Sequence, residues 1–139
     1  MSTCRFVLTN LAENATVLNG TAGSPTPPVR SETAPFTMER SLNPDRRSLW
    51  KAGAPNSIGA GTDWQLDIDL GAAMAINTAA IHGLSCPGGA ISGIGAGYLD
   101  SYPSATYVLI GGMQLNGRDA HMTFSTFTKR YWTFLIVAT

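Results

Sequence analysis

The chain has 139 residues, which is enough for one domain with a sizeable buried core. Its nine basic and nine acidic residues cancel, and charged residues make up only 13% of the chain, about half the usual share. No strong field would therefore draw the protein to nucleic acid or to an anionic membrane. A weakly charged surface is tolerable when neighbouring subunits cover it, so we expect a homo-oligomer.

The N-terminal third predicts short strands followed by an extended segment. Residues 5–9 and 15–18 have strand character, and Asn19-Gly20 is a turn signal. Residues 22–35 are too rich in proline for a central strand or a helix, and we predict an extended loop or arm. The prolines that we expect to contact other subunits are Pro25, Pro27, Pro28 and Pro35.

The middle of the chain contains its clearest strand. Residues 37–42 suit a single helical turn, and a polar turn at 43–49 leads into Trp50. Residues 64–70 then alternate apolar and polar side chains without a break, which predicts a strand with one buried face and one solvent-exposed face. Gly71 is expected to end this strand, because glycine gives the backbone the freedom that a turn requires.

The C-terminal half predicts further strands around a glycine-rich loop. Strands are expected at residues 76–84, 106–110, 122–125 and 131–137. The loop is expected to span residues 85–105, with its glycines concentrated before Tyr98. Many short strands without helical periodicity predict an all-β sandwich or barrel. The expected core comprises Phe6, Leu8, Trp50, Trp64, Leu66, Ile68, Leu70, Ile81, Val108, Ile110, Phe134 and Ile136.

Four segments in this order resemble a known fold family. A polar turn before a tryptophan (43–50), a Trp-to-Gly strand (64–71), a strand ending in His-Gly-Leu (76–84) and Arg130-Tyr131-Trp132 occur in sequence. Together they resemble the galactose-binding-like jelly roll, the fold of discoidin and coagulation-factor C-type domains. This resemblance implies a single jelly-roll β-sandwich domain over residues 1–139.

The compact element Asn-Pro-Asp-Arg-Arg-Ser-Leu-Trp at 43–50 resembles versions of this fold in tailed-bacteriophage virion proteins. The N-terminus shows no secretory signal, which agrees with assembly in the host cytoplasm. The resemblance implies a non-enzymatic attachment subunit of a virion, most simply a tail adaptor or tail-tip accessory. A capsid decoration protein is the alternative within that class.

Signals for chemistry are sparse. The two histidines, His82 and His121, lie in no nucleophile motif, and His82 falls in an apolar strand where a core histidine is expected. We therefore expect no catalytic residue and no cofactor. Asp63, Asp67 and Asp69 are too few for a calcium site, and the simpler interpretation is a solvated strand face or a partner for Arg46, Arg47 or Arg130. We expect no metal.

Carbohydrate binding is the alternative function from a different class. Sugars stack on aromatic rings and accept hydrogen bonds from polar groups held at loop ends. Tyr98, Asp100 and Tyr102 lie together in the predicted 85–105 loop. If they are accessible, they form a binding site for host-surface glycans.

Overall fold

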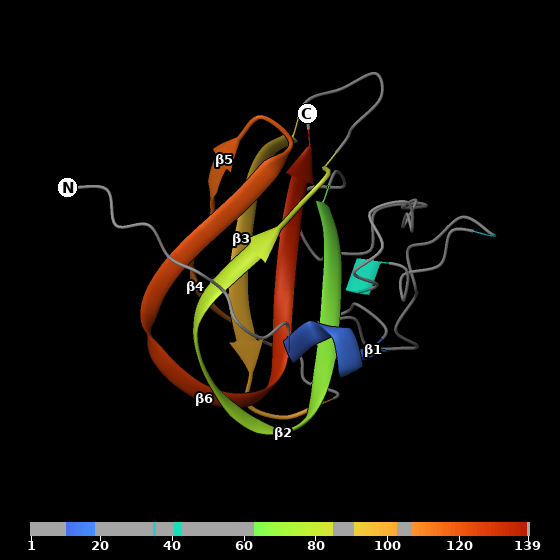
Figure 1. The fold of residues 1–139 in the computed structure, drawn as a ribbon, viewed down its shortest axis with the longest axis vertical. Helices are drawn as coiled ribbons and strands as arrows, with labels where there is room; N and C mark the ends of the chain where they lie inside the picture. Colours follow the sequence, from blue (N-terminus) through green and yellow to red (C-terminus); the bar gives the residue numbers. More distant parts are fainter. Residues whose placement is uncertain are drawn as a thin grey trace.

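The computed structural model describes residues 11–18, 35, 41–42, 63–84, 91–102 and 107–138. The predicted strand at 5–9, most of the Pro-rich segment and the turn before Trp50 lie outside these residues. The described elements are a short 3₁₀ helix and six strands (Figure 1). They are η1 (Leu11–Asn14), β1 (Thr16–Leu18), β2 (Asp63–Ile81), β3 (Ile91–Leu99), β4 (Val108–Gly112), β5 (Gln114–Asn116) and β6 (Asp119–Ala138). Among the described residues, no helix is long and apolar enough to cross a bilayer.

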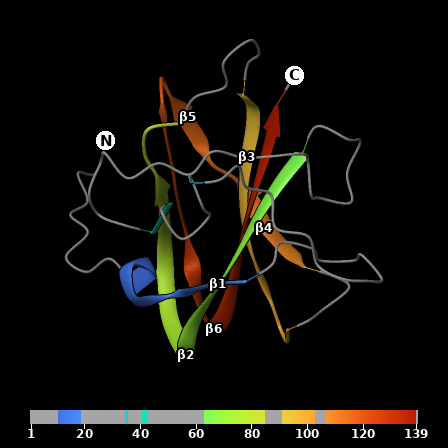
Figure 2. The ribbon, with the colours of Figure 1, turned by 90° about the vertical axis from the view of Figure 1, so that its right-hand side faces the viewer.

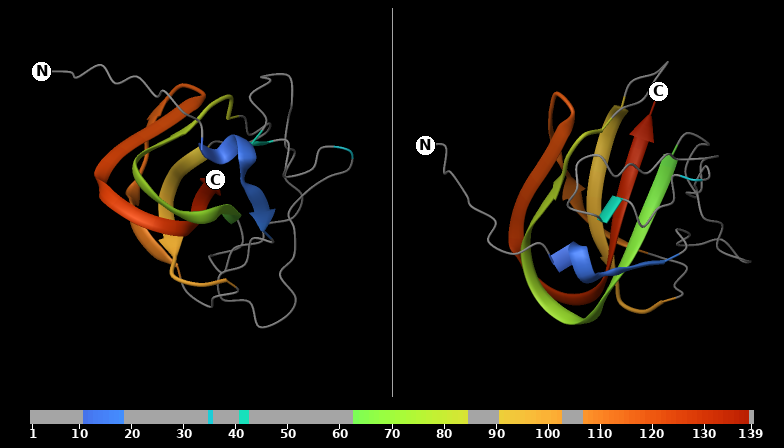
Figure 3. Two further views of the ribbon diagram at one scale, coloured as in Figure 1. Left: turned by 60° about the horizontal axis from the view of Figure 1, so that its bottom comes forward. Right: turned by 45° about the vertical axis from the view of Figure 1, so that its right-hand side comes forward.

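The strands are all antiparallel, in the order β1-β2-β6-β3-β4, with β5 paired to β6. The two longest strands, β2 and β6, pair along most of their length and curve together at one end (Figure 1). Each therefore contributes to two layers. The first half of β2 and the second half of β6 lie in the layer with β1, β3 and β4, and the other halves lie with β5 (Figure 2). Seen from the curved end, the strands surround a common interior (Figure 3).

The predictions at 64–70 and 76–84 are two halves of the single strand β2, and those at 122–125 and 131–137 are two halves of β6. Gly71 does not end the strand. It adopts a φ of 80°, and the pairing with β6 shifts register between Asp69 and Met74 before it resumes. Glycine tolerates this conformation, so the strand bends without losing its partner.

The interior is filled from both layers. Val17, Leu66, Ile68 and Trp132 form one buried cluster, and Phe124 from the first half of β6 packs against the Trp132 ring at 5.9 Å between centroids. A second cluster near the other end comprises Ala79, Ile94, Ala96, Met113 and Ala120.

The predicted core is largely confirmed where it is described. Leu66 and Ile68 are buried, and Leu70, Ile81, Ile110, Phe134 and Ile136 are partly buried against one of the two clusters. Trp64 is half-buried. The prediction that Val108 lies in the core is wrong. Val108 is 46% exposed on β4, which lies at one end of the strand order.

The glycine-rich segment is a strand over Ile91–Leu99, and the prediction of a loop is wrong there. The reason is the close approach of β4. A Cβ atom added at Gly97 would lie 2.4 Å from the Val108 carbonyl oxygen, and one at Gly95 would lie 2.7 Å from Leu109 Cδ1. These glycines therefore make room for a neighbouring strand, which is the use that strand glycines often have.

The prediction that the polar face of the 64–70 strand is exposed to solvent is also wrong for two of its residues. Gln65 and Asp67 were expected in solvent, yet both are fully buried, as is Thr133 opposite Asp67 on β6. The Gln65 amide Nε2 donates to both Asp67 carboxylate oxygens, at 2.9 and 3.1 Å. Burial of this face is possible because the polar side chains bind each other.

Candidate functional site

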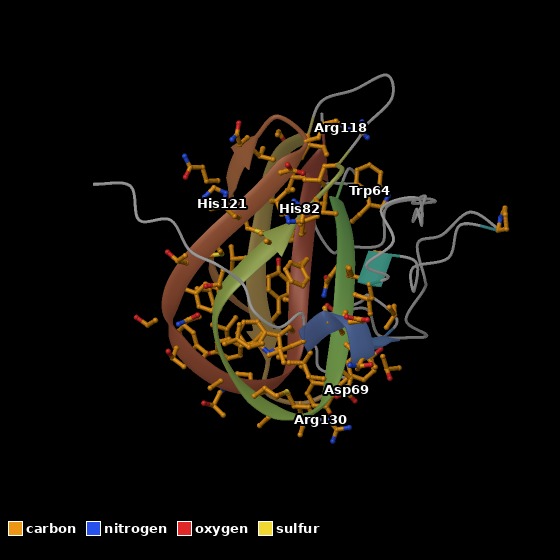
Figure 4. All side chains as sticks on the ribbon, viewed as in Figure 1. Trp64, Asp69, His82, Arg118, His121 and Arg130 are labelled. Atoms are coloured by element: carbon orange, nitrogen blue, oxygen red, sulfur yellow. The ribbon has the colours of Figure 1, made fainter. Side chains whose placement is uncertain are left out.

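Several described charged or titratable side chains lie toward the two ends of the sandwich (Figure 4). Asp69 and Arg130 lie where β2 and β6 curve, while His82, Arg118 and His121 lie at the opposite end. Between these ends, residues 71–81 of β2 and 120–128 of β6 contain no Asp, Glu, Lys or Arg. The two ends are therefore the places to look for polar recognition.

At the curved end, Asp69 and Arg130 form a two-pronged ion pair. Arg130 Nε donates to Asp69 Oδ1 at 2.7 Å, and an Arg130 terminal nitrogen donates to Oδ2 at 2.8 Å. The Gly71 backbone N–H donates to the same Oδ1 at 2.7 Å. The hydrogen bond from Arg130 lowers the pKa of Asp69, and Asp69 in turn raises the pKa of Arg130. The bend at Gly71 thus holds the carboxylate that holds Arg130.

Two tyrosine rings lie beside this pair. The Arg130 guanidinium carbon lies 5.0 Å from the centroid of the Tyr131 ring, within range of a cation–π contact. Tyr102, just beyond the end of β3, packs on Tyr131 with ring centroids 6.2 Å apart. Both tyrosines are half-buried. We call Asp69, Tyr102, Arg130 and Tyr131 the tyrosine cluster.

A second ion pair joins β6 to the residue just after β3. Lys129 Nζ binds Asp100 Oδ1 and also lies 4.3 Å from the centroid of the Tyr98 ring. The hydrogen bond to Asp100 raises the pKa of Lys129. The Lys129 carbonyl accepts the indole N–H of Trp132 at 3.1 Å. Lys129 thereby links the exposed carboxylate of Asp100 to the aromatic core.

The structure gives the three predicted ligand residues different surroundings. Tyr98 is part of β3 and packs against Phe127 and Trp132, with centroids 5.4 and 6.4 Å away. With Lys129 over its ring, Tyr98 serves packing more than stacking with a ligand. Asp100 is exposed, and Tyr102 belongs to the tyrosine cluster.

Two contributions of β6 were not predicted from the sequence: Lys129 contacts Tyr98 and Asp100, and Tyr131 contacts Tyr102. The third was among the predictions, since Arg130 was a possible partner of the aspartates and binds Asp69. The signal was present, because a charged pair followed by two aromatic residues is unusual in an interior strand. Of the predicted contact prolines, Pro35 is exposed in a turn, and Pro25, Pro27 and Pro28 lie outside the described residues.

At the opposite end, the side chains of Arg118 and Asp119 contact residues 82–84. His82 Nδ1 lies 3.3 Å from Asp119 Oδ1, which also accepts the Gly83 N–H at 3.1 Å. Arg118 Nε donates to the Leu84 carbonyl at 3.0 Å. His82 is not the core residue expected, since its side chain is 67% exposed just after β2 ends. These contacts join the end of β2 to the turn between β5 and β6.

Neither end gathers metal ligands. Within the described ranges, no three His, Cys, Asp or Glu side chains come close enough together to hold a metal ion. His82 and Asp119 are two such groups without a third. The geometry that remains for recognition is the aromatic and ion-paired surface at the curved end.

No protein-family model matches the chain, and no curated protein is similar to it. Solved structures do match. Chitosan-binding module 1 of a chitosanase/glucanase from Paenibacillus sp. IK-5 has a TM-score of 0.65 and 17% identity over 93% of this chain and 86% of its own. The family 32 carbohydrate-binding module of C. perfringens NanJ, in complex with galactose, has a TM-score of 0.58 and 14% identity, with 94% and 96% covered.

A GH29 fucosidase of Ruminococcus gnavus in complex with fucose also matches, with a TM-score of 0.66 and 17% identity over 94% of this chain. The chain spans only 24% of that enzyme, and the same share of the protein SpGH29. No phage protein stands among these structures, so the resemblance to virion proteins stays a prediction. The likeness confirms the fold: this chain is an all-β, galactose-binding-like jelly-roll sandwich.

Proposed function

We propose that this protein is a non-catalytic carbohydrate-binding module whose sugar site is the tyrosine cluster. The observation that carries the proposal is the Tyr102–Tyr131 ring pair with the Asp69–Arg130 ion pair against it. The Asp100–Lys129 ion pair joins the same two segments as the ring pair, the end of β3 and β6. Structures of the same fold that are named as binding chitosan or galactose support it.

The arrangement suits a sugar for a physical reason. The apolar C–H face of a pyranose packs on a tyrosine ring, while its hydroxyl groups need donors and acceptors in fixed positions. Arg130 donates from a planar guanidinium, and Asp69 fixes its orientation through two hydrogen bonds. Because these groups already hold one another in place, binding a sugar costs little ordering of side chains.

Removal of an aromatic ring tests the site directly. We expect Tyr131→Ala and Tyr102→Ala each to weaken sugar binding by about tenfold, since such a ring contact typically contributes about 1 kcal/mol or more. The measurement is calorimetric titration with the neutral sugars galactose and fucose. Tyr107→Ala, at a half-buried tyrosine outside the cluster, is the matched control and should bind as the unaltered protein does.

Tyr131 lies in a central strand, so a folding check is required. Circular dichroism and the thermal midpoint of unfolding separate a loss of binding from a loss of structure. Arg130→Gln changes a side chain that is 45% exposed, and it should weaken sugar binding while the protein stays folded. The proposal fails if no sugar binds the unaltered protein, or if Tyr107→Ala weakens binding as much as the cluster variants do.

The virion attachment role remains a second candidate. The weakly charged surface favours it, and sugar binding is compatible with attachment to a host surface. It predicts a stable oligomer held through contacts that include the Pro-rich arm. Light scattering over a range of concentrations measures this, and a monomer at every concentration would count against the virion subunit.

A further inference from the structure

The curved end contains two ion pairs, each of which balances one positive and one negative charge. They are formed by Asp69 with Arg130 and by Asp100 with Lys129. Each basic group is bound by one of the carboxylates, Arg130 by Asp69 and Lys129 by Asp100. Each cation thus already has a carboxylate bound to it, and each carboxylate a cation.

We propose that this site selects sugars by charge: it accepts neutral sugars and discriminates against both acidic and amino sugars, with Asp100 and Asp69 masking Lys129 and Arg130. This inference rests on the proposed function and specifies the ligand class of the same site.

The two directions of discrimination have different causes. An acidic sugar could pair with Lys129 only by displacing Asp100, and its carboxylate would then stand beside that of Asp100. An amino sugar that approached either carboxylate would meet the bound Lys129 or Arg130. In both cases a like charge adjoins the group that attracts the ligand, and such repulsion is a common source of specificity.

The expected difference in affinity is modest because the charged side chains are exposed to solvent. The Asp100 side chain is 71% exposed and that of Arg130 is 45% exposed. Two charges about 4 Å apart in a solvent-like dielectric alter a binding constant by about fivefold. We therefore expect neutral sugars to bind about fivefold more tightly than charged ones at low ionic strength, and the ratio to shrink as salt is added.

Three sugars that differ in one group provide the probe. Galactose, galactosamine and galacturonic acid share a ring and differ in charge, and the glucose series repeats the comparison with another ring configuration. Each is titrated into the full chain at a pH where the amine is protonated and the carboxyl is ionised. An affinity for either charged sugar that equals or exceeds the affinity for the neutral sugar overturns the charge selection while the sugar-binding function stands. Absence of binding by all six sugars overturns the proposed function itself.

Unmasking Lys129 is the sharper test. Asp100→Asn releases the ammonium group, and we expect the affinity for galacturonic acid, relative to galactose, to rise about threefold to fivefold. Asp119→Asn makes the same change in net charge at the opposite end of the sandwich and is the matched control. An unchanged ratio in Asp100→Asn, or an equal rise in Asp119→Asn, would refute masking by Asp100.

Discussion

Asp67 and Asp69 are two residues apart on one face of one strand, yet their environments shift their pKa values in opposite directions. Asp67 is fully buried, and burial raises its pKa, with the polar side chains of Thr133 and Gln65 beside it opposing that rise to a lesser extent. Asp69 is bound by Arg130 and its pKa is lowered. The same residue type in the same alternation thus becomes a buried polar contact in one place and part of a candidate site in the other.

Their positions along β2 account for the difference. Both lie between β1 and β6, Asp67 opposite Leu18 and Thr133, and Asp69 at the last paired position before the register shift. Asp69 lies just before the bend, where the Gly71 N–H and the Arg130 side chain both reach it. A strand pattern therefore tells which side a residue faces, while the path of the neighbouring strands decides what that side meets.

The largest effect is expected from Gln65→Leu. Removing the amide leaves the buried Asp67 carboxyl without its Nε2 donor, which should cost about 2 kcal/mol of unfolding free energy at neutral pH. Urea denaturation measures the loss. Gln114→Leu, at an exposed glutamine on β5, is the control and should change stability by less than about 0.5 kcal/mol.

A double variant tests the reason for that loss. Gln65→Leu with Asp67→Leu removes both polar partners, and we expect it to recover most of the stability. If the double variant loses as much unfolding free energy as the two single variants together, Gln65 and Asp67 do not stabilise the fold through their mutual contact.

The pH dependence of stability should have opposite signs at the two carboxyls. The folded pKa of Asp67 lies above its ordinary value of 3.8, so its contribution is fully present below that pH and is lost as the pH rises through the folded pKa. Asp67→Asn should therefore gain stability relative to the unaltered protein as the pH rises from about 3 to about 7.

Asp69 should behave in the reverse sense. Its folded pKa lies below 3.8, so its contribution is present above that pH and is lost as the pH falls through the folded pKa. Asp69→Asn should be less stable than the unaltered protein near neutral pH and equal to it in strong acid. Urea denaturation across the pH range measures both variants, and slopes of the same sign would break the comparison.

The smallest effect is the loss of stability in Asp69→Asn near neutral pH. The Arg130 side chain is 45% exposed, and ion pairs with one exposed partner contribute little because water and salt screen them. We expect less than half of the loss seen in Gln65→Leu, and we expect it to shrink further in high salt. A loss as large as that of the buried pair would place Asp69 among the core contacts.

Much of the fold was predictable from local patterns. The alternation at 64–70 identified a strand whose apolar face includes the buried Leu66 and Ile68. The bulky run at 131–137 identified the central strand with the buried Trp132. Such patterns are reliable because a strand with one buried face must repeat every second residue.

The candidate site was predictable only in part. Asp100 and Tyr102 were chosen because they follow one another in the chain, and they do lie at the end that carries the tyrosine cluster. Their partners Lys129 and Tyr131 come from β6, about thirty residues later, and no local pattern reports a register such as Leu99 opposite Tyr131. Tyr98 was misjudged for the same reason, since its contacts with Phe127 and Trp132 join separate strands.

The amino-acid sequence by itself determined the strand-forming segments, the all-β class and the weakly charged surface, because each depends on composition or on the period of side chains along a strand. Only the tertiary structure decided that Gly71 bends β2, that Gly95 and Gly97 admit β4, and that Asp67 is buried while Asp69 binds Arg130. The physical reason is that a glycine allows several backbone conformations and an aspartate can be either buried or ion-paired. Which of these occurs depends on the neighbouring atoms, and the fold alone determines those neighbours.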